Sequence, residues 1–253
     1  MTVITKRAAL VTGGAEGVGR IIALDLAAGG WNVAIQYFHR KQEADELVAR
    51  IRRDGGVAEA FQANLSREAE VEDLLPAACQ GVVALTLLVN AAAEFADDTL
   101  ATADRDSWDR HLETNLRAPF VLIQRFAAQL PPGETGCVIN VLDQRVLNLT
   151  PHYISYTLSK AGLWTLTRTL ALALAPRIRV NGIGPGAEFR PPRPDGEFGV
   201  APEDRPLRRP VEAEEVARAV RFILDTPSLT GQMLALDGGE HLGWAQPADA
   251  APR

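Results

Sequence analysis

Short apolar runs alternate along the chain with segments in which apolar residues recur every three or four positions. The short runs are typical of strands buried on both faces, and the longer period indicates helices with one apolar face. Strands are predicted near residues 7–12, 31–37, 57–63, 83–90, 136–142, 177–183 and 232–236. Helices are predicted near 21–28, 40–54, 66–80, 104–130, 153–175 and 212–224. This alternation predicts a parallel sheet that is covered by helices on both sides.

Length and charge are consistent with one enzyme-sized α/β domain. The chain has 253 residues, which suits a single α/β domain with a large core. Its hydrophobic content of 47% is ordinary for a globular protein. A net charge of −6 without a basic run argues against nucleic acid as the main partner. We therefore expect a small-molecule substrate.

The cysteines and the apolar runs bear on the compartment. Cys79 and Cys137 have neither metal-site nor C-x-x-C spacing, so we predict no metal site and a reducing environment. No opening segment has a signal-peptide pattern, and no apolar run reaches the ~18 residues that span a membrane. A cytoplasmic protein without membrane contact is expected.

A glycine-rich turn follows the first predicted strand. The segment Thr12-Gly-Gly-Ala-Glu-Gly-Val-Gly19 leads into a helical pattern that begins at Ile21. Glycines let backbone amides approach a pyrophosphate, which the positive end of the helix dipole then stabilises. The glycine spacing (Gly13, Gly17, Gly19) differs from the G-x-G-x-x-G of other dinucleotide folds. A glycine turn without a ligand is the alternative interpretation.

Tyr156 and Lys160 are four residues apart in a predicted helix, so both side chains lie on one face, one turn apart. A tyrosine hydroxyl ordinarily titrates near pH ~10, and a nearby ammonium lowers the pKa of such a group toward values that suit proton transfer. Tyr153 has Thr157 at the same spacing and gains no such partner. Because this spacing is also common on exposed helices, the pair carries weight only together with the glycine turn.

Together, the glycine turn and the Tyr156/Lys160 pair resemble the short-chain dehydrogenase/reductase family. Further family landmarks occur in order: Asn90-Ala-Ala after a strand, Asn115-Leu-Arg-Ala-Pro-Phe120 in a helix, Arg179-Val-Asn-Gly-Ile-Gly-Pro-Gly186 after a strand, and Leu236-Asp-Gly-Gly239. The resemblance covers nearly the whole chain. It implies a single doubly wound, Rossmann-type α/β domain over 1–253, with a mostly parallel seven-stranded sheet. It also implies an NAD(P)-dependent oxidoreductase that forms a homo-oligomer, a tetramer or a dimer.

The resemblance also assigns positions in the site. Lys160 is expected to bond the nicotinamide ribose, and Asn115 to hold a water that relays protons to Lys160. A buried amide that satisfies backbone groups is the alternative for Asn115. The expected cofactor contacts are Gly13, Glu16, Gly17, Val18, Gly19, His39, Arg40, Asn64, Leu65, Asn90, Ala91, Ala92, Tyr156, Lys160, Pro185 and Gly186.

The end of the second predicted strand, Ile35-Gln-Tyr-Phe-His-Arg-Lys41, favours NADPH. A carboxylate there would bond both ribose hydroxyls and select NAD, and the segment contains none. His39, Arg40 and Lys41 can instead meet a 2′-phosphate, with the arginine as a bidentate donor. Glu16 has the wrong charge for this role, and the basic residues could simply be solvated at the start of the next helix. NADP is favoured, and NAD stays open.

Asp143 is the position at which the chain departs most usefully from the wider family, which usually has a serine thirteen residues before the tyrosine. A serine hydroxyl donates to a developing alkoxide, whereas an ionised aspartate only accepts hydrogen bonds and repels that charge. A carboxyl suits a substrate with ring N–H groups and a C=N bond, where it can anchor donors or deliver a proton. A strand-end cap or an ion pair with Arg145 is the alternative.

An aspartate in this place resembles the pteridine reductase branch, which includes bacterial dihydromonapterin reductases. Phe95 stands where that branch has a phenylalanine that stacks on the pterin ring. The substrate contacts so implied are Phe95, Asp143 and Tyr156, and packing of Phe95 under a lid is the alternative. Glu16, Ala91 and Asn64 depart from residues common in the branch, which affects substrate and cofactor detail rather than the fold.

One segment interrupts the alternation of strands and helices. Glu188–Pro210 contains six prolines among charged residues and directly follows a strand end. Ligands of open α/β sheets bind beyond the carboxyl ends of the strands. We therefore expect a mobile substrate lid over about 186–212, with a plain surface excursion as the alternative.

The expected activity is hydride transfer from NADPH to a C=N or C=O bond, most simply of a pterin, with Tyr156 or Asp143 as the proton source. A generic carbonyl reductase or alcohol dehydrogenase is the alternative enzyme. A regulatory protein that senses NADP(H) without turnover is the alternative of another class. It is disfavoured because binding alone does not require Tyr156, Lys160 and Asn115. The sequence assigns no partner to His111 or His241.

Overall fold

The computed structural model describes residues 7–186 and 205–243. Seven strands form one sheet in the order β3-β2-β1-β4-β5-β6-β7, and every neighbouring pair is parallel. The strands are β1 (Ala8–Thr12), β2 (Asn32–Tyr37), β3 (Ala58–Gln62), β4 (Leu87–Asn90), β5 (Gly136–Val141), β6 (Ile178–Pro185) and β7 (Met233–Leu236). The seven predicted strands and the doubly wound α/β class are confirmed.

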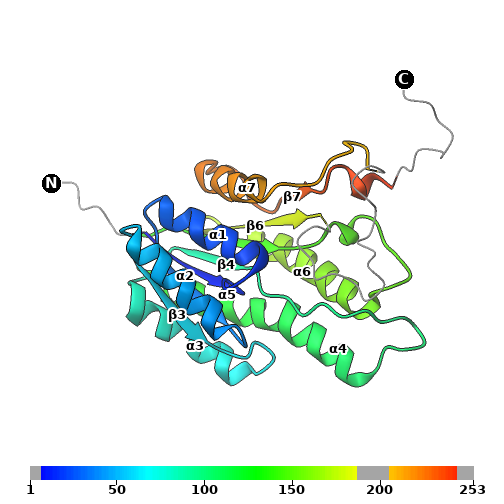
Figure 1. Cartoon of the computed structure of the whole chain (residues 1–253), viewed down its shortest axis with the longest axis horizontal. Helices are drawn as coiled ribbons and strands as arrows, with labels where there is room; N and C mark the ends of the chain where they lie inside the picture. The colour runs from blue at the N-terminus through cyan, green and yellow to red at the C-terminus, as the bar shows by residue number, and fades with distance from the viewer. Residues whose placement is uncertain (1–6, 187–204, 244–253) are drawn as a thin grey trace.

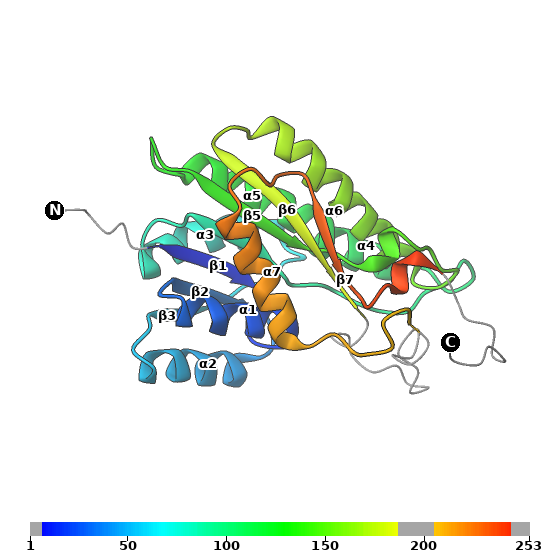
Figure 2. The same ribbon diagram turned by 90° about the horizontal axis from the view of Figure 1, so that it is seen from above.

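Helices cover both faces of the sheet (Figures 1 and 2). They are α1 (Gly17–Ala28), α2 (Lys41–Arg53), α3 (Glu68–Val82), α4 (Arg105–Leu112), α5 (Ala118–Gln129), α6 (Ile154–Ala173) and α7 (Ala213–Asp225). One core cluster combines α1, α2 and α7 with one face of the sheet, and another combines α3, α5 and α6 with the opposite face. No helix among the described residues is long and apolar enough to cross a membrane.

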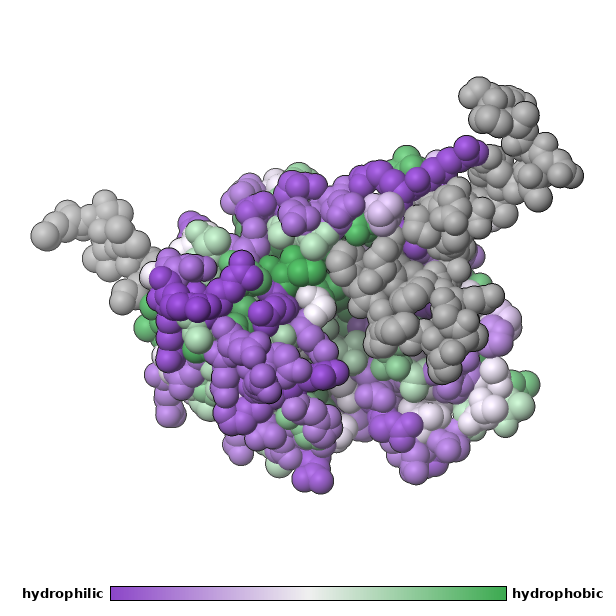
Figure 3. Space-filling model, in the orientation of Figure 1, coloured by the Kyte–Doolittle hydropathy of each residue, from purple (hydrophilic) through white to green (hydrophobic). Residues whose placement is uncertain are grey.

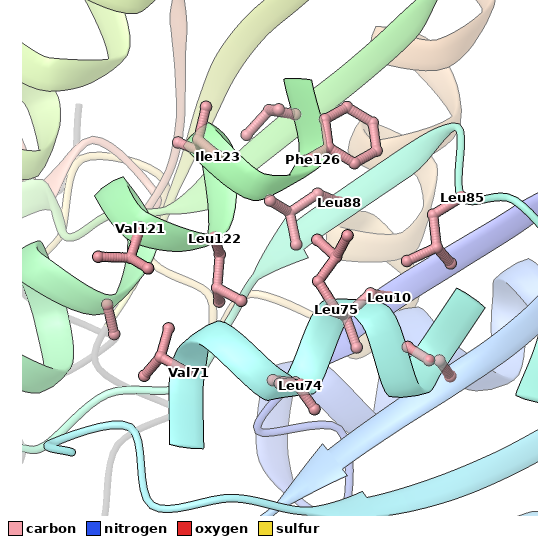
Figure 4. Close-up of a cluster of buried hydrophobic side chains, with 14 of the residues drawn as sticks. Leu10, Val71, Leu74, Leu75, Leu85, Leu88, Val121, Leu122, Ile123 and Phe126 are labelled. Atoms are coloured by element: carbon pink, nitrogen blue, oxygen red, sulfur yellow. The ribbon is translucent and has the colours of Figure 1, made fainter. Parts of the chain in front are cut away.

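The period of two along β1 explains how one strand serves both cores. Ala8 and Leu10 belong to the cluster under α3 and α5, whereas Ala9 and Val11 belong to the cluster under α1 and α2. All four side chains are fully buried. Figure 4 shows the first cluster, in which Leu10 and Leu88 of the sheet meet Leu75 of α3. Hydrophilic residues dominate the outer surface over α2 (Figure 3).

Some element boundaries differ from the sequence prediction. The single helix expected over 104–130 is α4, a π-helical turn over Glu113–Arg117, and α5. Pro119 has no backbone N–H to donate to the carbonyl of Asn115, four residues earlier, so one regular helical hydrogen bond is missing where the π-helical turn joins α5. Strand β4 begins at Leu87 rather than near 83, because Val83 ends α3 in a turn with a φ of 86°.

From β1 the chain adds β2 and β3 on one side of the sheet, and it then returns to add β4 and the later strands on the other side. Open α/β sheets bind ligands in the crevice beyond the carboxyl ends of the strands at such a point, which here lies between β1 and β4. The glycine turn follows β1, and the loop over residues 91–104, here called the Phe95 loop, follows β4. The predicted lid over about 186–212 lies mostly outside the described residues.

Candidate active site

The glycine turn is shaped for close approach of a ligand. Gly13 has a φ of 61° and Gly17 a φ of 52°, a backbone region that favours glycine. A Cβ on Gly13 would lie 2.8 Å from Cα of Ala92, and one on Gly19 would overlap the carbonyl oxygen of Gly13. Helix α1 begins at Gly17, and its N-cap residue Glu16 makes no side-chain cap hydrogen bond. The backbone amides at this helix start therefore suit an anionic group such as a pyrophosphate.

Residues from neighbouring strands hold this turn in place. Gly13 N–H donates to the Gln36 side chain at 2.8 Å, which ties the turn to β2. The Thr12 hydroxyl oxygen accepts from the amides of Ala91 and Ala92 at 3.0 and 3.1 Å. The predicted contacts of the glycine turn and of the segment after β4 are thus joined across the crevice between β1 and β4.

The basic residues after β2 lie at the surface beside the glycine turn. Arg40 Nε is 3.3 Å from Glu16 Oε2, and Arg40 also pairs with Glu43. The Lys41 ammonium lies 2.6 Å from Asp45 within α2, and His39 packs against the Phe38 ring. Of the three basic residues, Arg40 is therefore the one directly joined to the predicted phosphate-binding turn.

The other predicted cofactor residues occupy the same edge of the sheet. Asn90 ends β4, and its amide donates to Asn140 of β5 at 2.8 Å. The side-chain oxygen Oδ1 of Asn64 accepts from both Ser66 N–H and Ser66 Oγ, so this side chain organises the turn after β3. Pro185 ends β6, and Gly186 N–H donates to Leu236 O at 2.7 Å. Val18 lies in the first turn of α1, and Leu65 is buried in the core below Asn64.

Tyr156, Asp143 and Lys160 meet beyond the end of β5. Tyr156 Oη donates to Asp143 Oδ2 at 2.8 Å, and both residues are buried. Lys160 Nζ lies 5.8 Å from the centre of the Tyr156 ring and donates to the carbonyl of Val141 at 2.8 Å. The geometry thus places a cation and a carboxylate at one tyrosine.

Asp143 also makes the two contacts considered as alternatives to a role in the site. Its Oδ1 accepts from the backbone N–H of Arg145 at 2.8 Å, which caps a short 3-10 helix over Gln144–Val146. Its Oδ2 lies 3.7 Å from Nη1 of Arg145. Because the carboxyl has two oxygens, these contacts coexist with the one to Tyr156. The Asp143 side chain therefore both caps the 3-10 helix and bonds the Tyr156 hydroxyl.

Asn115 lies in the π-helical turn and is fully buried. Its amide oxygen accepts from Glu94 N–H at 2.8 Å, and its amide nitrogen donates to Glu94 O at 2.9 Å and to Ser159 Oγ at 3.0 Å. Ser159 directly precedes Lys160. Asn115 therefore ties the segment before Phe95 to the helix that carries Lys160, which is the contact pattern of the structural alternative for this residue.

Phe95 stacks on a ring that the sequence analysis did not single out as a contact. Its ring centre is 4.8 Å from that of Tyr153 at an interplanar angle of 12°, and 4.8 Å from that of Tyr156 at 86°. The Arg145 guanidinium lies 4.7 Å from the Tyr153 ring centre. Pairs of aromatic rings such as Phe95 with Tyr153 or Tyr156 contribute about 0.5–1.5 kcal/mol beyond burial. Phe95 thus packs against both Tyr153 and Tyr156.

The structure gives partners to His111, which lies near Tyr156, and to His241, neither of which could be assigned from the sequence. His111 contacts Ser155, which contacts Asp98, and all three side chains are buried. Burial lowers the pKa of His111 from its ordinary value, against the opposing charges of Asp98 and Glu94. His241 bonds Asp237 at 2.8 Å. The partners of His111 and Ser155 are distant in sequence, so no local pattern indicates them. Asp237 and His241 are four residues apart, and this spacing was the one sequence signal that could have indicated their contact.

Comparisons with known proteins identify the family of this chain. A family model described as enoyl-(acyl carrier protein) reductase matches residues 13–241. The 3-oxoacyl-[acyl-carrier-protein] reductase FabG of Staphylococcus epidermidis is 32% identical over 243 residues, which cover 94% of this chain and 100% of that protein.

Two solved structures are similar over nearly the whole chain. FolM alternative dihydrofolate reductase 1 from Brucella canis, complexed with NADP, is 42% identical with a TM-score of 0.88, and the match covers 97% of this chain and 98% of that one. A blue fluorescent protein from a metagenomic library, in complex with NADPH, is 33% identical with a TM-score of 0.85, covering 92% and 97%.

The parallel sheet and the glycine turn are those of a dinucleotide-binding fold, and the similar proteins show that the chain is an oxidoreductase. The chain belongs to the short-chain dehydrogenase/reductase family. The family resemblance on which the sequence analysis relied is therefore confirmed.

Proposed function

We propose that this protein is an NADPH-dependent reductase that transfers hydride to the C=N bond of a pterin. The observation that carries the proposal is the 2.8 Å hydrogen bond from Tyr156 Oη to Asp143 Oδ2 just beyond β5. It places a hydrogen-bond acceptor, rather than the serine hydroxyl donor usual in the family, beside the expected proton donor. A carboxylate accepts from ring N–H and amino groups, which pterins carry and simple ketones lack.

The proposed cofactor is NADPH. The glycine turn fits a pyrophosphate, and Arg40 stands at its surface beside the end of β2, where a 2′-phosphate would lie. Both solved structures described above contain NADP or NADPH. When bound, NADPH supplies the hydride and is oxidised to NADP⁺.

The residues of the chain divide the remaining tasks. Tyr156 donates a proton to the ring nitrogen while the adjacent carbon receives the hydride, so the C=N bond becomes CH–NH. Lys160, held by the Val141 carbonyl, keeps a positive charge near the tyrosine as the proton leaves. Asp143 orients the pterin through its N–H donors, and Phe95 provides an aromatic wall beside Tyr156.

A carbonyl reductase is the second candidate. The curated relative described above is named as a 3-oxoacyl-[acyl-carrier-protein] reductase, which is a C=O substrate class. Against this candidate stands Asp143, because an ionised carboxylate beside Tyr156 repels the alkoxide that forms when a carbonyl is reduced. The similarity to FolM alternative dihydrofolate reductase 1 favours the pterin-type substrate.

Steady-state assays with purified protein separate the candidates. NADPH oxidation is followed with dihydrobiopterin, dihydromonapterin and dihydrofolate, and in parallel with simple ketones and an acetoacetyl thioester. Turnover of pterins with much lower turnover of carbonyl compounds supports the proposal, and the reverse pattern rejects it in favour of the second candidate. Tight NADPH binding without turnover of any of these compounds would favour the sensor.

We further propose that the protein acts as a homotetramer. The support for this assembly is the family resemblance, since family members usually form tetramers through neighbouring long helices. In the single chain, the long helix α6 carries Leu158 and Leu172, which are 48% and 84% exposed. Size-exclusion chromatography with light scattering tests this assembly, and a monomer at assay concentration would contradict it.

A further inference from the structure

A buried chain of hydrogen bonds links the Phe95 loop to the start of α6. Ala96 N–H donates to His111 Nε2 at 3.1 Å, and His111 Nδ1 bonds Ser155 Oγ at 2.6 Å. Ser155 Oγ in turn donates to Asp98 Oδ2. Asp98, His111 and Ser155 are each at most 2% exposed. This series of hydrogen bonds begins at Ala96 and ends at Asp98, both in the Phe95 loop, and passes through His111 of α4 and Ser155 of α6.

The directions of these hydrogen bonds determine the form of His111. A backbone N–H can only donate, so Nε2 is the acceptor and carries no proton. The neutral imidazole therefore has its proton on Nδ1 and donates a hydrogen bond to Ser155 Oγ, and the Ser155 hydroxyl donates a hydrogen bond to Asp98. Serine stands in the middle of this chain and is buried, so the arrangement is unlike that of a nucleophilic triad.

Asp98 completes the start of the catalytic helix. Tyr153, the N-cap residue of α6, has a left-handed backbone (φ 58°, ψ 44°) and makes no side-chain cap bond. Asp98 supplies the cap instead: its carbonyl accepts from Tyr153 N–H at 2.8 Å, and its Oδ1 accepts from Ser155 N–H at 3.2 Å. Tyr156 is the next residue. The cap therefore sets where both tyrosine rings stand relative to Phe95.

We propose that Asp98, His111 and Ser155 are positioning residues, and that neutral His111 locks the Phe95 loop against the start of α6 so that the substrate site is assembled. Protonation of His111 places an N–H on Nε2 opposite the Ala96 N–H, so two donors face each other and the loop loses its anchor. The site then loses substrate binding while the glycine turn, on the other side of the crevice, keeps NADPH. This proposal rests on the proposed function in treating Phe95 and Tyr156 as substrate contacts.

The charged surroundings of His111 fix the direction of the pH effect. Asp98 and Glu94 from the Phe95 loop favour the imidazolium, whereas Arg110 from α4 opposes it, and the Tyr156 ring from α6 packs edge-on at 5.9 Å. Burial outweighs these charges and lowers the pKa of His111 below its ordinary 6.5. Loss of substrate binding is therefore expected only on the acid side of that value.

The test compares His111→Gln with His111→Ala. A glutamine amide can accept from Ala96 N–H and donate to Ser155 Oγ, but it does not titrate. H111A should raise the KM for substrate about 5- to 100-fold, the effect of leaving a buried donor unpaired, and should change the KM for NADPH by less than about twofold. H111Q should restore the KM at neutral pH and remove the acid limb of its pH profile. An acid limb that persists in H111Q overturns the proposal.

A second measurement needs no substrate and does not depend on the stability of H111A. Nitrogen-15 NMR of the wild type, assigned with H111Q, should show His111 neutral at neutral pH with the proton on Nδ1. A proton on Nε2, or an imidazolium at neutral pH, would contradict the proposed lock.

If pterins are not reduced, the kinetic comparison uses the carbonyl substrate that the protein does reduce. Failure of the proposed function is thereby distinguished from failure of this inference.

Discussion

Nε of Arg40 lies 3.3 Å from Oε2 of Glu16, which joins the end of β2 to the glycine turn. From the sequence, the two residues predict opposite cofactor preferences, since Arg40 suits the 2′-phosphate of NADPH and Glu16 has the wrong charge for it. Both side chains are more than half exposed, at 57% and 62%. An exposed pair of this kind contributes only ~0–1 kcal/mol, so a phosphate can compete for the guanidinium.

Substitution of Arg40 should change cofactor preference. R40A is expected to weaken NADPH binding by about tenfold or more, since it removes charged hydrogen bonds to the 2′-phosphate, and to leave NADH binding nearly unchanged. E16Q should strengthen NADPH binding by up to about fivefold because it releases Arg40. Fluorescence titration with both cofactors measures the effects. K41A is the matched control, since Lys41 pairs with Asp45; equal effects of K41A and R40A would contradict this assignment.

Removal of the Tyr156 hydroxyl should abolish most catalysis. Y156F keeps the ring that packs against Phe95 and Lys160 but deletes the proton donor. We expect kcat to fall by roughly 10²- to 10⁴-fold, the usual contribution of general acid catalysis, and NADPH affinity to change far less because the other expected cofactor contacts remain. Steady-state kinetics and cofactor titration measure the two quantities. Y153F, which keeps the stacked ring next to Phe95, is the control and should lose far less activity.

Replacement of Asp143 by serine should shift the substrate class. D143S restores the hydroxyl usual in the family, which donates to a developing alkoxide. Pterin reduction should fall by about 10- to 100-fold in kcat/KM, because substrate N–H groups lose a charged acceptor, while reduction of ketones should rise. D143A is the matched variant that removes the carboxylate without supplying a donor; it should lose pterin activity, and its ketone activity should rise less than that of D143S. Unchanged selectivity in D143S would show that Asp143 is only a cap.

Acid should remove a stabilising contact at the start of α7. The Arg209 guanidinium and the Glu212 N–H lower the pKa of Glu215 from 4.5 to about 2. The folded state thus favours the carboxylate, so its stabilisation is complete above about pH 4.5 and is lost as the pH falls toward about 2. Urea unfolding across this range should show E215Q less stable than wild type at neutral pH, with the difference shrinking in acid. E214Q removes the same charge from the same turn and should show no such convergence.

The sequence by itself determined the order of strands and helices, the parallel sheet and the glycine-rich turn. These follow from local patterns: the apolar run in β1, the apolar period in α2, and the glycine spacing before α1. The Tyr156/Lys160 pair was predictable for the same reason, since the helix places residues four apart on one face. Asp143 and Phe95 were identified only through family resemblance.

Only the tertiary structure decided how these residues meet. The partners of Tyr156 and Phe95 lie 13 and 58 residues away in sequence, at Asp143 and Tyr153. The link from His111 to Ser155 spans 44 residues, and that from Ser155 to Asp98 spans 57. Such contacts depend on how loops close over the carboxyl edge of the sheet, which no local period encodes. The elements are therefore set by short-range periodicity, and the site by long-range packing between them.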